Sequence, residues 1–148
     1  MAPLKRKGDL AEIKVAADLM ERGYRIAFPF GEDWDYDLIL ARGNRLERIQ
    51  VKHACSDGDV IPVKCYSHSL TNGRIRQTKH YPSLTIDWLA VYDHTTARCF
   101  YIPAAELGDG KSTLHLRLTD AKNCQRRGIR FADDYASPET RQLPVGGT

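Results

Sequence analysis

The first part of the chain shows a helical pattern of hydrophobic positions. Apolar side chains recur three and four residues apart over Asp9–Arg22, which predicts an amphipathic helix. Asp9 is expected as the N-cap, with Glu12 completing a capping box, and Gly23 as the residue that ends the helix. The side chains expected to face the core are Leu10, Ile13, Ala17 and Met20.

The pattern then changes to short apolar runs separated by turn residues, which predicts strands. Pro62 places one of these runs at a sheet edge or a bulge, and Ala104–Leu107 is expected to form one helical turn. Ser67–Ser83 has no clear period, which is typical of a loop. The expected strands are Tyr24–Phe28, Tyr36–Ala41, Leu46–His53, Val60–Tyr66, Leu84–Tyr92, Arg98–Ile102 and Leu114–Leu118.

The hairpin expected around Gly43 and Asn44 concentrates the candidate chemistry. In an antiparallel pair the start of one strand lies beside the end of the other, so Asp37 is expected beside Gln50 and Lys52. Gln50 and Lys52 are two residues apart and leave the same face of their strand. A carboxylate, an amide oxygen and an ammonium would therefore converge, which suits a hard metal ion acting on a phosphate.

The same residues also allow a purely structural interpretation. Asp37 could be a turn residue, and Asp33 and Asp35 compete with it for the role of metal ligand. Gln50 and Lys52 could form the solvent face of an edge strand. Because Asp37 directly precedes an apolar strand and a helix with a carboxylate comes before it, the combination favours a site.

Length and composition predict one soluble globular domain, 1–148, with a basic arm at 1–7 and a flexible tail at 137–148. The chain is 42% hydrophobic and 28% charged, with a net charge of +3. No apolar stretch could span a membrane and no signal core follows the basic N-terminus, so a cytoplasmic protein is expected. The cysteines form no CxxC pair, which disfavours a zinc site and predicts free thiols: Cys55, Cys65, Cys99 and Cys124.

Taken in order, these motifs resemble the PD-(D/E)XK nuclease superfamily, and within it the group I intron-associated endonucleases. The resemblance covers roughly Lys7–Tyr135 and implies a restriction-endonuclease-like α/β core, a central mixed β-sheet flanked by helices. The D…QxK motif alone is weakly specific, whereas the ordered series is much stronger. The stretches that carry the resemblance are Lys7–Glu12, Gly23-Tyr24, Pro29–Glu32, Tyr36–Leu38, Gln50–Lys52, Ile86–Tyr92, Lys122-Asn123, Gly128–Phe131 and Asp134-Tyr135.

The resemblance also implies roles for individual residues. Asp37 would be the principal ligand of Mg²⁺, for which Mn²⁺ would substitute, and the Val51 carbonyl a further ligand. Gln50 stands where Asp or Glu is more common, so it offers an oxygen without a charge. Glu12 would hold a metal-bound water or help bind a second ion, and Lys52 would lie beside the attacking water and the scissile phosphate.

The implied function is Mg²⁺-dependent, site-specific cleavage of double-stranded DNA by a homodimer or homotetramer, as in homing endonucleases. A nuclease resembling Holliday-junction resolvases, a catalytically silent DNA-binding protein of the same fold, and a structural or protein-interaction domain remain alternatives. Two basic stretches suit contact with DNA, although the first could equally be a solvated loop. Their candidate residues are Arg74, Arg76, Lys79, His80, Lys122, Arg126, Arg127 and Arg130.

Overall fold

The structure, a computed structural model, describes residues 4–71, 74–80, 85–107, 113–120 and 128–139. The expected strands, the helical turn and the first helix are all present, with boundaries that differ by a few residues. Within the described ranges, no helix combines the length and apolarity that crossing a membrane requires. The elements are α1 (Leu4–Glu21), β1 (Arg25–Ala27), β2 (Leu38–Arg42), β3 (Arg45–Ala54), β4 (Val60–Lys64), β5 (Tyr66–Thr71), β6 (Arg74–His80), β7 (Trp88–Asp93), β8 (Arg98–Pro103), η1 (Ala104–Glu106), β9 (Thr113–Arg117), β10 (Arg130–Phe131) and η2 (Ala132–Tyr135).

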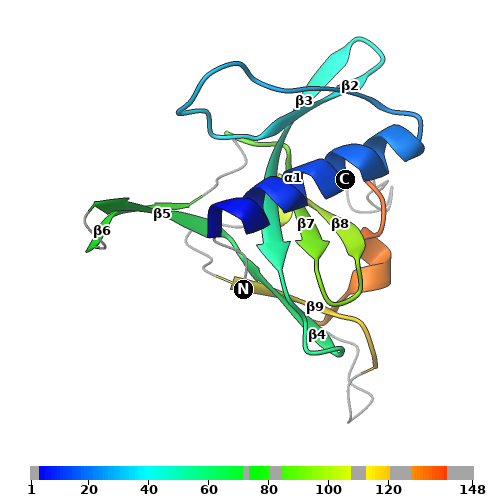
Figure 1. The fold of residues 1–148 in the computed structure, drawn as a ribbon. Helices are drawn as coiled ribbons and strands as arrows, with labels where there is room; N and C mark the ends of the chain where they lie inside the picture. Colours follow the sequence, from blue (N-terminus) through cyan, green and yellow to red (C-terminus); the bar gives the residue numbers. More distant parts are fainter. Residues whose placement is uncertain (1–3, 72–73, 81–84, 108–112, 121–127, 140–148) are drawn as a thin grey trace.

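A five-stranded mixed sheet in the order β1-β2-β3-β7-β8 forms the centre of the molecule. β3 and β7 are parallel, and the other neighbours in this sheet are antiparallel. Helix α1 crosses one face, and a smaller sheet in the order β10-β9-β4 lies on the other side (Figure 1). The α/β fold class expected from the sequence is confirmed, although among the described residues α1 is the single α-helix that flanks the sheet.

Helix α1 packs on the sheet through a face that only partly matches the expected one, since Leu10 packs against this core but the other expected residues do not. Ala11, Val15 and Leu19, spaced four residues apart, are fully buried, whereas Ile13 and Met20 are 64% and 62% exposed. The helix also begins at Leu4, so Asp9 lies inside it and the predicted N-cap and capping box are wrong. The buried residues of α1 are on average smaller than the expected ones. The prediction was wrong because it chose the more hydrophobic stripe of the helix.

The end of α1 follows the sequence signal at Gly23. This glycine has a φ of +90°. Its N–H donates to the Met20 carbonyl, and the N–H of Tyr24 donates to the Leu19 carbonyl, both at 3.0 Å. This pair of hydrogen bonds is the Schellman motif, in which a left-handed residue closes the helix. The chain can therefore turn directly into β1.

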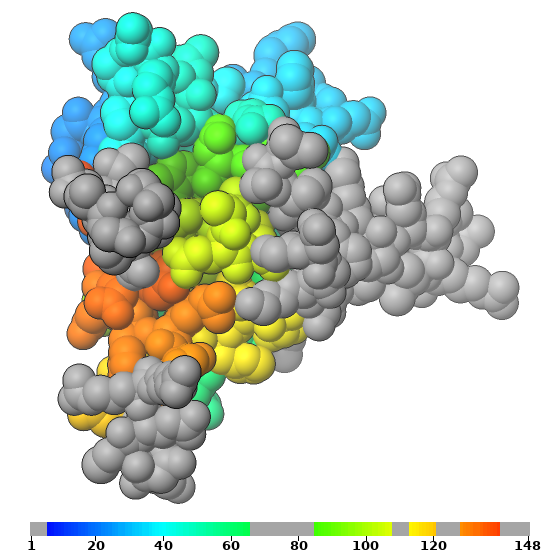
Figure 2. All heavy atoms as spheres, turned by 180° about the vertical axis from the view of Figure 1, so that it is seen from behind, coloured from blue at the N-terminus to red at the C-terminus, as the bar shows by residue number. Residues whose placement is uncertain are grey.

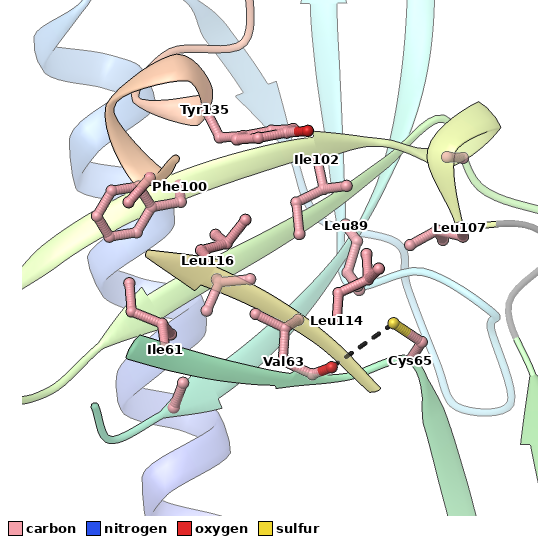
Figure 3. Packing of buried hydrophobic residues seen from close by; sticks show 14 of the residues in the cluster. Ile61, Val63, Cys65, Leu89, Phe100, Ile102, Leu107, Leu114, Leu116 and Tyr135 are labelled. Carbon is pink, nitrogen blue, oxygen red and sulfur yellow. Dashed lines mark hydrogen bonds between the residues drawn. The ribbon is translucent and has the colours of Figure 1, made fainter. Parts of the chain in front are cut away.

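The opposite face of the sheet carries the larger core. Leu89, Phe100 and Ile102 of the central sheet pack against side chains of the small sheet and of η2 (Figure 3). Pro62 lies in β4, which is an edge strand of the small sheet, as expected from the missing N–H. Cys65 is buried and its thiol donates to the Val63 carbonyl at 3.6 Å.

The segment expected to be a loop, Ser67–Ser83, instead contains strands. β5 and β6 pair antiparallel with a register shift after Ser69, and they extend away from the central sheet (Figure 1). The expected arm at 1–7 is in part the first turn of α1. Residues 1–3 and 140–148, which belong to the expected arm and tail, lie outside the described residues, as does Cys124. Cys55, Cys65 and Cys99 are not joined by disulfide bonds.

Candidate active site

Asp37 directly precedes β2, at the edge of the central sheet that is formed by the strand ends. Its N–H donates to the Ile49 carbonyl at 2.8 Å, and its carboxylate accepts the Val51 N–H at 2.9 Å. The backbone pairing of β2 with β3 ends at Leu38 and Ile49. Beyond this pair, the Asp37 carboxylate accepts the Val51 N–H in place of a backbone carbonyl of β2. The hairpin thus places Asp37 beside the second half of β3, as the sequence predicted.

Glu12 of α1 reaches this edge and forms a side-chain hydrogen bond with Asp37. Burial, followed by the negative charge of Asp37, raises the pKa of Glu12 to about 7. Burial also raises the pKa of Asp37, although its hydrogen bond from Val51 opposes the shift. Glu12 therefore stays partly protonated near neutral pH, because burial and the adjacent carboxylate both disfavour its charged form.

Gln50 and Lys52 lie on one face of β3, half-buried, while Ile49 and Val51 are buried on the other. Burial lowers the pKa of the Lys52 ammonium, and the Asp37 carboxylate offsets part of this shift. The structure thus brings a cation into the electrostatic reach of Asp37. For Gln50 the structure gives the strand position alone, so its convergence with Asp37 stays a prediction.

The backbone of Val51 also faces this edge. β3 has β7 on one side over Ile49–Ala54, but its register with β2 ends at Ile49. The Val51 N–H donates toward Asp37, and in a strand the N–H and C=O of one residue point to the same side. The Val51 carbonyl is therefore directed to the side where Asp37 lies, beyond the end of the β2 pairing.

A cavity of about 260 Å³ opens beside the two carboxyl groups. The loop between β1 and β2 forms its wall and was not singled out by the sequence, although Pro29 and Gly31 are turn residues. The cavity shows that Glu12 and Asp37 are accessible from solvent. Its lining residues are Glu12, Phe28, Pro29, Gly31, Glu32, Asp33, Trp34, Tyr36 and Asp37.

The donors at this edge suit a hard divalent cation. In the part of the chain that the structure describes, no three His, Cys, Asp or Glu side chains are grouped closely enough to hold a metal ion by themselves. The oxygens at this place are the carboxylates of Glu12 and Asp37 and the Val51 carbonyl, and Gln50 directly precedes Val51 on β3. Mg²⁺ fits such a set, because it takes oxygen ligands and keeps several waters. A cation would also relieve the repulsion that raises the pKa of Glu12.

The candidate DNA contacts that the structure describes lie on two strands, β6 and β10. Arg74, Arg76, Lys79 and His80 all belong to β6. Arg130 of β10 is half-buried and its guanidinium lies 3.6 Å from the Glu106 carboxylate, so it has a structural ion pair. The other three candidates lie outside the described residues: Lys122, Arg126 and Arg127.

A larger cavity, of about 340 Å³, lies between α1 and the β7–β8 hairpin. Its carboxylate Asp18 accepts hydrogen bonds from Arg22 at 2.9 Å and from the Tyr101 hydroxyl at 2.6 Å. Burial raises the pKa of the Cys99 thiol beside it to about 12, which leaves the thiol unreactive. This cavity is larger than the one at Asp37, but its lining does not include the pair of carboxyl groups of Glu12 and Asp37.

The comparisons with known proteins agree with this geometry. The sequence model of the PD-(D/E)XK endonucleases matches residues 3–138. The solved structure of the bacterial homing endonuclease I-Ssp6803I is similar, with a TM-score of 0.73 and 22% identity over 90% of this chain and 88% of that chain. That likeness shows a shared fold, and no curated protein matches the sequence significantly. Since the family model spans nearly the whole chain, this protein belongs to the PD-(D/E)XK endonuclease family.

Proposed function

We propose that this nuclease is a Mg²⁺-dependent endonuclease that cleaves double-stranded DNA at specific sites, in the manner of a homing endonuclease. The observation that carries the proposal is the contact between the carboxyl groups of Glu12 and Asp37, beside Lys52 and an accessible cavity. Two acidic groups held together at a cost in repulsion are typical of a cation site. The family of the chain and its likeness in fold to a homing endonuclease support the same chemistry.

Asp37 would be the principal ligand of the ion, with the Gln50 amide oxygen and the Val51 carbonyl beside it. Glu12 would bind through a water or contribute to a second ion. Bound there, Mg²⁺ supplies Lewis acidity to the phosphate and acidifies a water. Because Gln50 brings no charge, the affinity for the ion is expected to be modest, and Mn²⁺ is expected to substitute.

The residues of the chain would hold and polarise the reacting groups. The Val51 N–H fixes the Asp37 carboxylate, so that the carboxylate needs no reorientation when DNA arrives. The Lys52 ammonium would stabilise the negative charge that builds up on the phosphate. Its lowered pKa also makes it a better proton donor or acceptor near neutral pH than an exposed lysine.

DNA binding is proposed to use β6, where four basic or potentially basic residues follow one another within seven positions. One active site per chain cuts one strand, so cutting both strands calls for at least two copies. A two-fold arrangement of copies would read an approximately palindromic site. The proposed substrate is therefore a duplex with two-fold symmetry.

The test incubates the purified protein with a pool of DNAs in Mg²⁺, in Mn²⁺ and in EDTA. The pool includes linear duplexes from the region around its own gene and a four-way junction. Discrete metal-dependent cuts in the linear duplexes, lost in Asp37→Ala, are expected. Preferential cutting of the junction would replace the homing activity by a resolvase activity.

A DNA-binding protein without catalysis is the second candidate, because an uncharged Gln50 stands where a carboxylate is more common. It predicts that Asp37→Ala binds the same duplexes as the native chain and that Gln50→Glu creates no cleavage. The absence of cuts in both metals, combined with tight binding, would favour this candidate over the endonuclease.

A further inference from the structure

The loop between β1 and β2 carries aromatic side chains out into solvent. Phe30 is 97% exposed, Phe28 59% and Trp34 52%. The same loop lines the cavity that contains Glu12 and Asp37. In Figure 2 this segment, light blue, projects at the upper right edge of the molecule. Several large aromatic side chains exposed together on one loop are typical of a surface that meets a partner.

The tip of the loop is held in place by its own contacts. The indole N–H of Trp34 donates to the Phe30 carbonyl at 2.8 Å, and the Trp34 and Tyr36 rings lie 5.5 Å apart. Gly31 and Asp33, between these residues, have φ angles of +95° and +69°. The backbone of Phe30 is therefore tied back to the wall of the cavity, while its ring points away from the protein. Such a tip is pre-organised, so little conformational entropy is lost when it binds.

Any duplex whose scissile phosphate reaches Asp37 must lie against this loop, because the loop borders the cavity at that residue. The loop is acidic, with Glu32 and Asp33 both exposed. Carboxylates repel the phosphate backbone, so the favourable contact available to the tip is an apolar one with bases. An exposed ring that avoids phosphates and meets bases is the arrangement of proteins that wedge a side chain between base pairs.

We propose that Phe30 inserts between two base pairs next to the scissile phosphate and unstacks them, which positions the phosphate at Asp37. This inference rests on the proposed DNA cleavage. The step that it enters would be one that unstacks easily, with a pyrimidine followed by a purine. Phe30 would thus help to choose the cleavage site without a hydrogen bond to any base, and it is a positioning residue rather than a catalytic one.

The test measures unstacking directly. 2-Aminopurine, whose fluorescence rises when it leaves the base stack, replaces single adenines around the cut in a duplex that the native chain cleaves. If no duplex is cleaved, the duplex bound most tightly is used, with each of its adenines replaced in turn. The complexes are formed in EDTA, so that the DNA stays intact. Phe30→Ala is compared with Phe30→Trp, which keeps a large ring, and with Leu46→Ala, which removes an apolar residue that is 72% exposed at the start of β3.

The native chain, Phe30→Trp and Leu46→Ala are expected to raise the fluorescence at one step beside the cut. Phe30→Ala is expected to lose the rise and to bind about 5- to 150-fold more weakly, the effect of one base–aromatic stack. A fluorescence rise and an affinity unchanged in Phe30→Ala would overturn the wedge. So would a shift of Phe30→Ala to a smaller oligomer with unstacking intact, because Phe30 would then join copies of the chain.

Failure of the proposed function gives a different result. The native chain would then cut no duplex in Mg²⁺ or Mn²⁺, whatever the fluorescence shows in EDTA. If it also bound no duplex, both the cleavage and the wedge would be rejected. Cleavage by the native chain without any unstacked step would reject the wedge alone.

Discussion

Protonation of Glu12 makes the stability of the folded chain depend on pH. The pKa of Glu12 in the folded chain is about 7, against 4.5 for an unperturbed group. Between these values the folded state binds more protons than the unfolded state, so the free energy of unfolding decreases as pH rises through this window. Above about pH 7 the penalty is complete, and below about pH 4.5 it is absent.

Glu12→Gln is therefore expected to stabilise the metal-free protein at pH 8 and to leave its stability nearly unchanged at pH 4.5. The gain at pH 8 is expected to be about 1 kcal/mol, since the partly exposed group is screened by solvent. Urea unfolding in EDTA at both pH values measures it, with Glu21→Gln on the same helix as the control. Equal effects of Glu12→Gln at both pH values would show that the pKa of Glu12 is not raised in the folded chain.

Lys52 allows a second prediction at this scale. Lys52→Met keeps a long side chain on β3 but removes the charge, so it is expected to slow DNA cleavage by about 100- to 1,000-fold, as the loss of one transition-state contact does. Binding should change little, because the ammonium acts on charge that develops during the reaction. Single-turnover cleavage and filter binding separate the two effects. Lys14→Met, at an exposed position of α1, provides the control.

At the scale of elements, helix α1 gives a comparison between two neighbouring residues. Leu19 is fully buried against the central sheet, whereas Met20 is 62% exposed. Leu19→Ala is expected to lower the free energy of unfolding by about 2–5 kcal/mol, through lost burial and the cavity left behind. Met20→Ala is expected to change it by less than about 0.5 kcal/mol. Urea denaturation of both variants measures this, and equal losses would indicate that the outer face of α1 is also covered.

That comparison shows where sequence reasoning failed for this helix. Leu10, Ile13, Ala17 and Met20 formed the more hydrophobic stripe, so amphipathicity favoured it. The sheet instead covers a stripe of smaller residues, since close packing of a helix on a sheet depends on shape as well as on hydrophobicity. Within the helix, hydrophobicity favours the wrong stripe, and the position of the sheet decides which one is buried.

The hairpin of β2 and β3 could be predicted, because its information is local. The turn at Gly43 fixes the register, and the register fixes which side chains meet at the Asp37 end. The contact between Glu12 and Asp37 could not be deduced in this way, since it depends on the tertiary packing of α1. β5 and β6 were missed because Ser67–Ser83 is mostly polar, and a strand without an apolar face has no period to detect.

At the scale of the whole molecule, β5 and β6 and the loop before β2 extend toward the same side of the central sheet (Figure 1). If β6 contacts phosphates, Arg74→Ala and Arg76→Ala should each weaken DNA binding and lower the slope of log K against log salt by about one. Titrations between about 50 and 200 mM salt measure this. Arg45→Ala, at the opposite end of the β2–β3 hairpin, should leave the slope unchanged. An unchanged slope in the β6 variants would place the DNA surface elsewhere.

Each chain carries one candidate site, so the pattern of cleavage reports how many chains act together. In an equal mixture of native chains and Asp37→Ala chains that exchange freely, about half of all dimers would hold one working site. These dimers are expected to nick a symmetric duplex in one strand, so nicked product should accumulate that the native protein alone does not leave. Native gels of a plasmid substrate separate nicked from linear DNA. If the mixture gave only linear product at half the rate, each chain would cut both strands in turn, and the paired arrangement would be rejected.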